Sequence, residues 1–290
     1  MGQLNLFKDL FMLKECHKEW PLGQKTVYVQ TYTPDLLYPV PRTLARDKTG
    51  IFGALPFHGV DIWNAFEISW LNAKGKPEIA LAELTFPCTS ENIVESKSLK
   101  LYLNSFNQTR FDSFETVAKV IEGDLKKIIC EEIEVKLYPH SHFEKTALEG
   151  FSGVCLDNLD IETTTYQVER KFLFIEEEDT KKEDVEETLY TDLFKSNCLA
   201  TGQPDWGSLW IHYVGKRINH EGLLKYLISF RDHSGFAEHC VEQIYYDIMQ
   251  QCSPKNLSVY GRYTRRGGLD INPFRSNFES NPTNIRQVRQ

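Results

Sequence analysis

The sequence predicts an α+β fold built from two tandem copies of one unit, in which antiparallel strands are backed by helices. Two internal matches predict the repeat. The pattern Ala-x-Gly-x-Pro-acid occurs at residues 73–78 and recurs at residues 200–205, 127 positions later. The run LKLYLNSF at 99–106 matches LLKYLISF at 223–230, at a spacing of 124.

Each copy is expected to begin with a β-hairpin. The runs NAFEISWL (64–71) and IALAELTF (79–86) flank the first turn, and YTDLFKSNCL (190–199) and WGSLWIHYV (206–214) flank the second. Alternating apolar residues bounded by Gly and Pro are typical of hairpins. Counting by 127 pairs Cys198 with Leu71 and Asp205 with Glu78. The second copy alone therefore has a thiol at this position.

Two helices and a closing strand follow in each copy. The first helix has apolar residues at helical spacing, namely Leu99, Tyr102, Leu103 and Phe106. For the second helix, Asp112 and Glu115 resemble a capping box in the first copy, and Ser234 is the expected N-cap in the second. The runs EIEVKLY (132–138) and LSVYGRYT (257–264) are predicted closing strands.

The repeat also predicts the domain organisation. We expect an N-terminal module over residues 15–170, an acidic linker over 171–190 and a C-terminal module over 191–282. The linker contains IEEEDTKKEDVEETLY (175–190), a charge-dense run that is typical of a solvated tether. More strand-like material is expected between residues 139 and 174.

Composition narrows the class of protein. A net charge of −8 and a pI near 5.6 argue against a general nucleic-acid binder, which needs a basic face. No apolar run approaches the roughly 20 residues that span a bilayer, and charges interrupt the N-terminus too often for a signal peptide. Seven scattered cysteines without a CxxC pair predict reduced thiols in the cytoplasm, with no disulfide framework and no metal site.

Four stretches could bear chemistry. Cys198 with Asp205 reads either as a reactive thiol beside an acid or as a buried core thiol. ESKSLK (95–100) reads as a phosphate site at a helix start or as an ordinary capped turn. Glu238 could accept paired N–H donors from a guanine-like edge while Phe236 stacks, or it could only favour the helix dipole. YTRRGGLD (263–270) suits phosphate oxygens or a plain strand end.

Three of these stretches together resemble one family. ESKSLKLYLNSFNQTRF (95–111), SNCLATGQPDWGS (196–208) and RYTRRGGLDINPFRS (262–276) are similar to the QueF family of NADPH-dependent 7-cyano-7-deazaguanine reductases, in its long two-module form. The match extends from VPRTLARD (40–47) to INPF (271–274). The resemblance implies tandem tunnelling-fold (ββαα) repeats, sheets closed into a barrel by subunit association, and a homodimer in the cytoplasm. It implies no nucleic-acid or membrane partner.

The resemblance also implies residue roles. Cys198 would form a thioimide with the nitrile carbon, and Asp205 would donate the proton. The deazaguanine would be bound by Val94, Glu95, Ser96, Phe236, Ala237 and Glu238. NADPH would be held by Ser96, Lys97, Arg266 and Gly267, and two NADPH would be used per nitrile. One position departs from the family, which usually has His where this chain has Ala237.

Two other functions remain as alternatives. A zinc-dependent purine or pterin cyclohydrolase of the same fold would need His or Cys ligands near Cys198, and none accompany it. A non-catalytic nucleotide- or tRNA-binding module is the other alternative, and the acidic pI counts against RNA.

Overall fold

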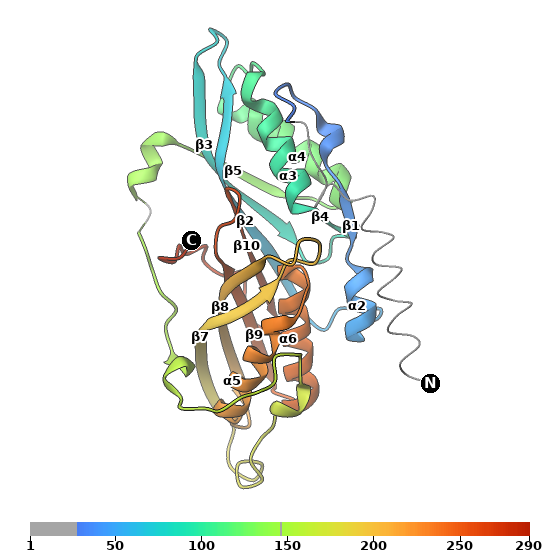
Figure 1. Cartoon of the computed structure of the whole chain (residues 1–290), viewed down its shortest axis with the longest axis vertical. Helices are drawn as coiled ribbons and strands as arrows, with labels where there is room; N and C mark the ends of the chain where they lie inside the picture. The colour runs from blue at the N-terminus through green and yellow to red at the C-terminus, as the bar shows by residue number, and fades with distance from the viewer. Residues whose placement is uncertain (1–27, 146) are drawn as a thin grey trace.

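The computed structural model describes residues 28–145 and 147–290, and its centre is one eight-stranded sheet. The strand order is β5-β3-β2-β10-β9-β8-β7-β6, antiparallel except for the β6–β7 pair (Figure 1). The strands are β2 (His58–Leu71), β3 (Pro77–Pro87), β5 (Glu134–Pro139), β6 (Val154–Cys155), β7 (Val185–Asn197), β8 (Pro204–Gly215), β9 (Asn256–Tyr263) and β10 (Leu269–Ser276). A small second sheet pairs β1 (Pro39–Pro41) with β4 (Asn92–Val94). The predicted α+β class is confirmed.

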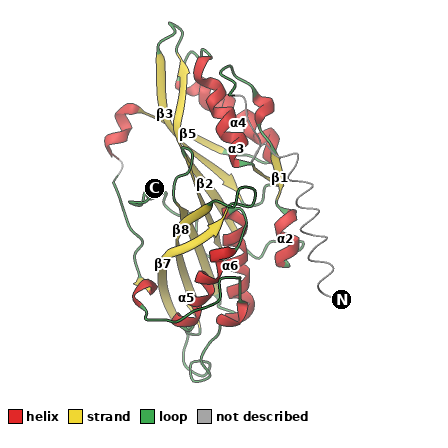
Figure 2. Cartoon of the chain, viewed as in Figure 1, coloured by secondary structure: helices red, strands yellow, loops and turns green. Residues whose placement is uncertain are grey.

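Four of the five described α-helices form two pairs that follow the two hairpins, and α2 precedes the first hairpin (Figure 2). The α-helices are α2 (Thr43–Thr49), α3 (Ser96–Asn104), α4 (Phe114–Ile129), α5 (His220–Ile228) and α6 (Ala237–Cys252). The 3-10 helices are η1 (Pro34–Leu36), η2 (Ser105–Gln108), η3 (His140–Lys145), η4 (Leu156–Asn158), η5 (Arg170–Phe172) and η6 (Ser229–Asp232). Each half therefore runs hairpin, helix, helix, strand.

The two halves share a buried contact as well as an element order. Tyr102 of α3 donates a hydrogen bond to Asp124 of α4 at 2.9 Å. Tyr226 of α5 donates to Asp247 of α6 at 2.7 Å. Each hydrogen bond links the two helices of its half. A buried hydroxyl without a partner costs free energy, so these bonds favour the observed packing of the helices.

Strand β10 joins the halves into one sheet. It pairs with β2 over eight residues, from Leu269 opposite Ala65 to Ser276 opposite His58. Alternate residues of a strand share a face. Leu269 and Ile271 pack in the core under α3 and α4, while Arg275 of the same face binds Glu242 of α6. Both helix pairs consequently cover one face of the sheet (Figure 1).

The core follows the predicted apolar stripes. Leu99, Tyr102, Leu103 and Phe106 are all buried, as expected from their helical spacing. Burial of a side chain of this size stabilises the fold by about 1.5–3 kcal/mol. In the second half, Cys240, Val241, Ile244 and Ile248 of α6 are buried against β8 and β9.

Both predicted helix caps were wrong by one or two residues. Ser113, not Asp112, caps α4, and its hydroxyl accepts from the Thr116 N–H at 3.1 Å. Ser234 does not cap α6, since Phe236 precedes that helix without a side-chain cap bond. The main chain on either side of Ser234 is hydrogen-bonded to Asn197 at the end of β7, which holds this segment extended.

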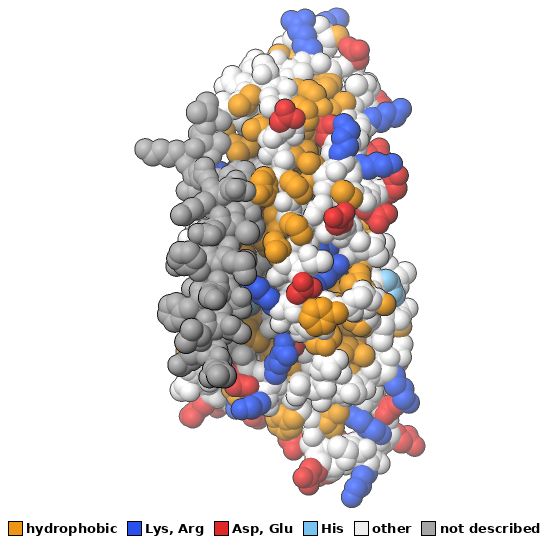
Figure 3. Space-filling model, turned by 90° about the vertical axis from the view of Figure 1, so that its right-hand side faces the viewer, with side chains coloured by type: hydrophobic (Ala, Val, Ile, Leu, Met, Phe, Trp, Pro, Cys, Tyr) orange, Lys and Arg blue, Asp and Glu red, His pale blue; other side chains and the backbone are white. Residues whose placement is uncertain are grey.

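The predicted linker and the strand-like region before it also need correction. Residues 185–190 belong to β7, where their alternation pairs them with β8 despite the acidic side chains. The described part of this region, residues 139–145 and 147–174, contains two-residue β6 and short 3-10 helices rather than further long strands. Because residues 185–190 are paired with β8, charge density alone does not distinguish a tether from a strand. Cationic and anionic side chains are interspersed on the face of the molecule shown in Figure 3.

Candidate active site

A pocket lies where the two halves meet on the helix-covered face. Its chemistry-bearing residues come from four places: Ser96 begins α3, Ala237 begins α6, and Cys198 and Asp205 flank the β7–β8 turn. Arg266 reaches it from the turn between β9 and β10. The rest of the lining is Leu199, Gly235, Phe236, Tyr263, Thr264, Leu269 and Ile271. The N-terminal ends of two helices thus border one pocket, and both favour negative charge.

The β7–β8 turn fixes Cys198 at the pocket wall. The Cys198 N–H donates to the Gln203 carbonyl at 2.8 Å, and the Gly202 N–H donates to the Cys198 carbonyl at 2.9 Å. Gly202 has φ +66°, a conformation that glycine adopts without strain. The thiol-bearing residue is 6% exposed, so Cys198 is largely shielded but faces the pocket.

Strand register corrects the expected equivalence of Cys198 and Leu71. Leu71 pairs with Pro77 in the first hairpin, and Asn197, not Cys198, pairs with Pro204 in the second. The second turn is one residue longer, so counting by 127 holds after the turn but fails before it. Cys198 is the first turn residue and therefore corresponds to Asn72, whose N–H likewise bonds the last turn residue, Lys76, at 2.9 Å.

The corrected equivalence places the thiol and the carboxylate at facing positions on either side of the β7–β8 turn. In the first hairpin, Asn72 Nδ2 donates to Glu78 Oε1 at 2.9 Å across the turn. Cys198 and Asp205 stand at the corresponding positions of the second hairpin and line the same pocket. The arrangement suits proton exchange between an acid group and a nucleophile.

Asp205 is paired with Arg266. One guanidinium nitrogen, Nη2, lies 3.1 Å from Asp205 Oδ1, and Nη1 donates to Gln203 Oε1 at 2.7 Å. Burial raises the pKa of Asp205 above its ordinary value, while Arg266 and Lys195 act in the opposite direction. A carboxyl with a raised pKa can hold a proton closer to neutral pH than an exposed aspartate can.

Glu238 is a second unusual carboxylate, at the start of α6. It is 1% exposed, and neither of its oxygens has a hydrogen-bond partner within the protein. Burial, followed by the charge of Asp61, raises the pKa of Glu238 to about 8, although Arg42 and Arg275 oppose the shift. A buried acceptor without a partner is costly, and N–H donors of a bound ligand would satisfy it.

A buried ionic cluster lies beside Glu238 and was missed from the sequence. Asp61 is bound by Arg42 at 2.6 Å and by Arg275 at 2.8 Å. Glu242, one turn after Glu238, is bound by Arg46 at 2.7 Å and by Arg275 at 2.8 Å. The two arginines in VPRTLARD (40–47) were the available signal, because charged residues among apolar ones are rarely buried unless paired.

The remaining predicted residues divide into two groups. Ser96 lines the pocket, whereas Val94 and Glu95 lie behind it, fully or nearly fully buried. The Glu95 carboxylate accepts from the N–H groups of Lys97 at 2.9 Å and Ser98 at 2.8 Å. Glu95 is thus the N-cap of α3, which is the ordinary capped turn left open by the sequence.

Cationic groups gather at the mouth of the pocket. The Arg266 side chain is 39% exposed, and the next residue, Gly267, lies in an adjoining hollow with Lys100. A Cβ on Gly267 would stand 2.9 Å from Lys100 Nζ, and the φ of +63° favours glycine there. An arginine fork, a lysine and close main chain fit phosphate groups, so these residues suit a nicotinamide dinucleotide phosphate.

The two histidines near Ala237 do not replace the family histidine in this pocket. His239 lies edge-on to Phe236, with ring centroids 5.4 Å apart, and burial lowers its pKa to about 4. His233 and His239 both line a separate pocket between α2 and α6, behind Phe236. Phe236 and Gly235 form the partition between the two pockets.

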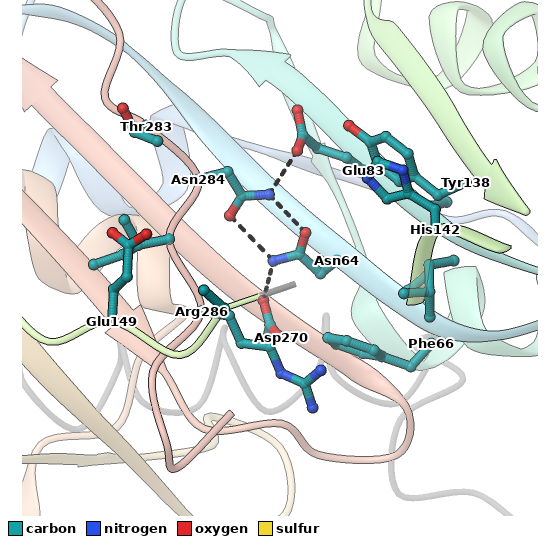
Figure 4. A pocket seen from close by; sticks show the side chains of 15 residues that line it. Asn64, Phe66, Glu83, Tyr138, His142, Glu149, Asp270, Thr283, Asn284 and Arg286 are labelled. Atoms are coloured by element: carbon teal, nitrogen blue, oxygen red, sulfur yellow. Dashed lines mark hydrogen bonds between the residues drawn. The ribbon is translucent and has the colours of Figure 1, made fainter. Parts of the chain in front are cut away.

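A different pocket, of about 260 Å³, lies on the helix-free face of the sheet (Figure 4). Its floor is a chain of hydrogen bonds in which Asn284 donates to Glu83 at 2.7 Å and Asn64 donates to Asp270 at 2.7 Å (Figure 4). It holds none of the residues predicted for catalysis or binding. The chemistry expected from the sequence therefore maps to the pocket between the halves.

Neither a metal-binding cluster nor a membrane-spanning helix is found in residues 28–145 and 147–290. No group of three or more His, Cys, Asp or Glu side chains in these ranges could hold a metal ion. Within the same ranges, every helix is too short or too polar to cross a bilayer.

Known proteins match this chain over most of its length. The family model described as nitrile reductase, 7-cyano-7-deazaguanine-reductase N-terminal, matches residues 28–137, and the QueF-like protein model matches residues 204–282. Proteins named NADPH-dependent 7-cyano-7-deazaguanine reductase from Burkholderia vietnamiensis, Burkholderia multivorans and Paraburkholderia phymatum are each 52% identical over 271 residues. These alignments cover 93% of this chain and 98% of each relative.

An α+β protein whose pocket brings together a thiol, a half-buried carboxyl and a guanidinium has groups suited to covalent catalysis. At this level of identity and coverage, the chain belongs to the QueF family of nitrile reductases.

Proposed function

We propose that this protein reduces the nitrile of 7-cyano-7-deazaguanine to the primary amine, with NADPH as the reductant, through a thioimide on Cys198. The observation that carries the proposal is the shared pocket of Cys198 and Asp205 at the N-terminal ends of α3 and α6. The 52% identity to relatives that bear this activity in their names supports the same substrate and cofactor.

The proposed first step is capture of the nitrile by the thiol. Asp205 accepts the proton of Cys198, the sulfur attacks the nitrile carbon, and Asp205 returns the proton to the nitrile nitrogen. A thiolate is the nucleophile best suited to this weak electrophile. The product is a neutral thioimide, in which the carbon–nitrogen bond has lost one of its two π pairs.

Reduction then proceeds in two stages. NADPH, when bound, supplies hydride to the thioimide carbon and later to the imine carbon. At each stage Asp205 and water supply the proton that the nitrogen needs. Between the stages the carbon–sulfur bond breaks, which returns the sulfur of Cys198 and leaves an imine in the closed pocket.

The substrate-binding roles follow from chemistry around the pocket. Glu238 accepts N–H donors from the guanine-like edge, Phe236 stacks on the ring, and Ser96 and Ala237 border it. Val94 and Glu95 shape the binding site from behind by fixing the start of α3. Ser96, Lys97, Arg266 and Gly267 hold the phosphates of NADPH, in keeping with the cationic pocket mouth.

The proposal extends to the assembly. The chain comprises two tunnelling-fold modules, at 15–170 and 191–282, joined by the acidic segment 171–190, whose end already belongs to β7. Two chains associate as a cytoplasmic homodimer that closes the sheets into a barrel. Supporting features are the similar order of elements in the two halves and a sheet that ends in β5 and the two-residue β6.

Intact-mass measurement after mixing with 7-cyano-7-deazaguanine, without NADPH, tests the central step. The wild-type protein should gain the mass of one substrate, and Asp205→Asn should form this adduct at least about 100-fold more slowly. Glu78→Gln is the matched control, because Glu78 holds the corresponding position of the first hairpin. Adduct formation at the wild-type rate in Asp205→Asn would remove Asp205 from the mechanism.

A further inference from the structure

Arg266 connects the predicted proton carrier to the predicted cofactor site. Its guanidinium lies on Asp205 at 3.1 Å and donates to Gln203 at 2.7 Å, and both acceptors belong to the β7–β8 turn. A guanidinium has five N–H donors, so these two contacts leave donors available on the 39% exposed side chain.

The reaction places opposite demands on Asp205. During attack by Cys198, the carboxylate must be ionised so that it can accept the thiol proton. During reduction, the same group must carry a proton to a nitrogen. One fixed environment favours one of these protonation states over the other.

We propose that Arg266 is a positioning residue that switches Asp205 between these roles. Seated on Asp205, Arg266 keeps the carboxylate ionised for capture of the nitrile; drawn away by the phosphates of NADPH, it leaves Asp205 able to hold a proton for reduction. This inference rests on the proposed function and assigns to Arg266 more than cofactor affinity.

The charges that face Asp205 support the switch. Arg266 and Lys195 are the cations that lower its pKa, and the buried Cys240 of α6 and Tyr263 of β9 face it from behind. Lys195 Nζ is already committed to Asn197 Oδ1 at 2.7 Å and to the Arg231 carbonyl at 2.5 Å. Lys195 is therefore poorly placed to replace Arg266, and burial dominates once Arg266 leaves.

The turn that carries Arg266 adjoins a hollow lined by Lys100 and its partner Glu67, whose charged atoms are 3.8 Å apart. Gly267 and Gly268 follow Arg266 with φ of +63° and +79°, and Lys100 stands beside Gly267. A phosphate at this mouth would bring Arg266 toward Lys100 and away from Asp205, because a guanidinium binds phosphate oxygens in a fork.

The proton count balances in both positions. In the seated position, the Cys198 S–H proton passes to Asp205 and then to the nitrile nitrogen as the S–C bond forms. In the released position, Asp205 takes a proton from water and gives it to the nitrogen as the carbon accepts hydride from NADPH. Arg266 itself stays protonated throughout.

The test measures the rate of thioimide formation against pH by intact mass, without reductant, for wild type and Arg266→Ala. Because Asp205 must be ionised to accept the thiol proton, the rate falls as pH drops through its pKa. Removing Arg266 should move this acid limb upward by about one pH unit, or about tenfold in rate below the limb. NADP+ should produce the same upward movement in wild type and no further movement in Arg266→Ala.

Two further variants guard the interpretation. Arg266→Lys keeps the charge and should restore most of the wild-type acid limb even if Arg266→Ala is poorly folded. Arg265→Ala is the matched control, because Arg265 lies over the Phe66 ring at 4.5 Å and not on Asp205. An acid limb that is unchanged in both Arg266→Ala and NADP+-treated wild type would overturn the switch. Absence of any adduct in wild type would instead overturn the proposed function.

Discussion

The two hairpins of this protein have the same frame and different tips. In the β2–β3 hairpin, Asn72 bonds Glu78 within the hairpin, and Lys76 lies 3.3 Å from Glu78 in solvent. In the β7–β8 hairpin, the corresponding residues are Cys198 and Asp205, and Asp205 binds Arg266 of another turn. The Glu78 carboxylate of the first tip is paired with residues of its own hairpin, whereas the Asp205 carboxylate of the second is paired with an arginine from another turn.

The helices that follow the hairpins differ in the same way. The second and sixth residues of α4 are the exposed Glu115 and Lys119, and those of α6 are the buried Glu238 and Glu242. At these positions α4 is exposed to solvent, whereas α6 contacts the opposite half of the molecule. The comparison shows that the unusual carboxyl groups lie where one half of the molecule covers the other.

The largest expected effect comes from exchanging the tip residues. Cys198→Ala should abolish the covalent adduct with 7-cyano-7-deazaguanine, measured by intact mass, because no other thiol in residues 28–145 and 147–290 has an acid partner across a turn. Adding Asn72→Cys to that variant should not restore the adduct, since the first tip lacks the helix ends and Arg266 that complete the pocket.

Two observations would break this first prediction. Cys130→Ser alters a thiol far from the pocket and should leave the adduct in place. An adduct that survives Cys198→Ala, or returns with Asn72→Cys, would show that the nucleophile or its surroundings had been misplaced.

The next effect concerns the sixth residues of α4 and α6. Glu242→Gln leaves Arg46 and Arg275 buried without their common partner, and breaking a buried ion pair costs about 3–5 kcal/mol. Lys119→Gln, at the solvated position of α4, should change the free energy of unfolding by less than about 0.5 kcal/mol. Denaturant unfolding at neutral pH compares the free energies of unfolding of the two variants. Equal destabilisation would mean that the buried ionic cluster does not account for the difference between α4 and α6.

The second residues of the helices should differ in their dependence on pH. Burial raises the pKa of Glu238 to about 8, so the folded protein retains a proton that the unfolded chain releases above pH 4.5. Stability therefore falls as pH rises from about 4.5 to 8. Glu238→Gln removes this loss and should be the more stable protein at pH 8.5 by about 2–4 kcal/mol, with little difference at pH 4.5.

Glu115→Gln is the control for that measurement, since Glu115 is exposed at the same position of α4. The free energy of unfolding of Glu115→Gln should not rise above that of wild type at high pH. Unfolding curves of Glu238→Gln that track wild type at both pH values would contradict a neutral, buried Glu238. The Glu238→Gln variant should also bind the deazaguanine more weakly, because the amide replaces one of the two carboxyl oxygens with an NH2 group that donates and cannot accept.

The smallest effect is expected at the first residue of α6. Ala237→His introduces an imidazole beside Glu238, where a buried neutral ring could relay a proton. Because water can also carry protons to the substrate nitrogen, single-turnover reduction of the preformed thioimide should rise by no more than about tenfold. A rate that stays equal or falls across pH would indicate that this pocket has adapted to alanine.

Local sequence patterns predicted most of the helices and strands of the fold. Leu99, Tyr102 and Leu103 revealed α3 by spacing alone, and the Gly-Pro turns revealed both hairpins. The errors lie where longer-range contacts decide. The sequence predicts Ser234 as a helix cap, but hydrogen bonds to Asn197 hold its segment extended. The sequence predicts residues 185–190 as a tether, but they pair with β8.

The site was predictable in composition but not in arrangement. Cys198 and Asp205 stand out because a turn connects them, and the family resemblance supplied the other candidates. The Arg266–Asp205 pair spans two turns, and the Glu242 cluster draws arginines from α2 and β10. Nothing in local spacing reports such contacts, and a one-residue insertion hid the match between Cys198 and Asn72.

The eight-residue pairing of β10 with β2 has a consequence for how this chain can be divided. By sequence β10 ends the second half, yet its longer ladder is with the first half, for it meets β9 over three residues. Cleavage of the chain in the acidic stretch before β7 would therefore leave two fragments that stay associated. The main-chain hydrogen bonds between β10 and β2 and the ion pairs of the buried arginines would hold them together. The first fragment would carry Ser96 and the second the other residues that line the pocket, so the lining is complete only when the two fragments are paired.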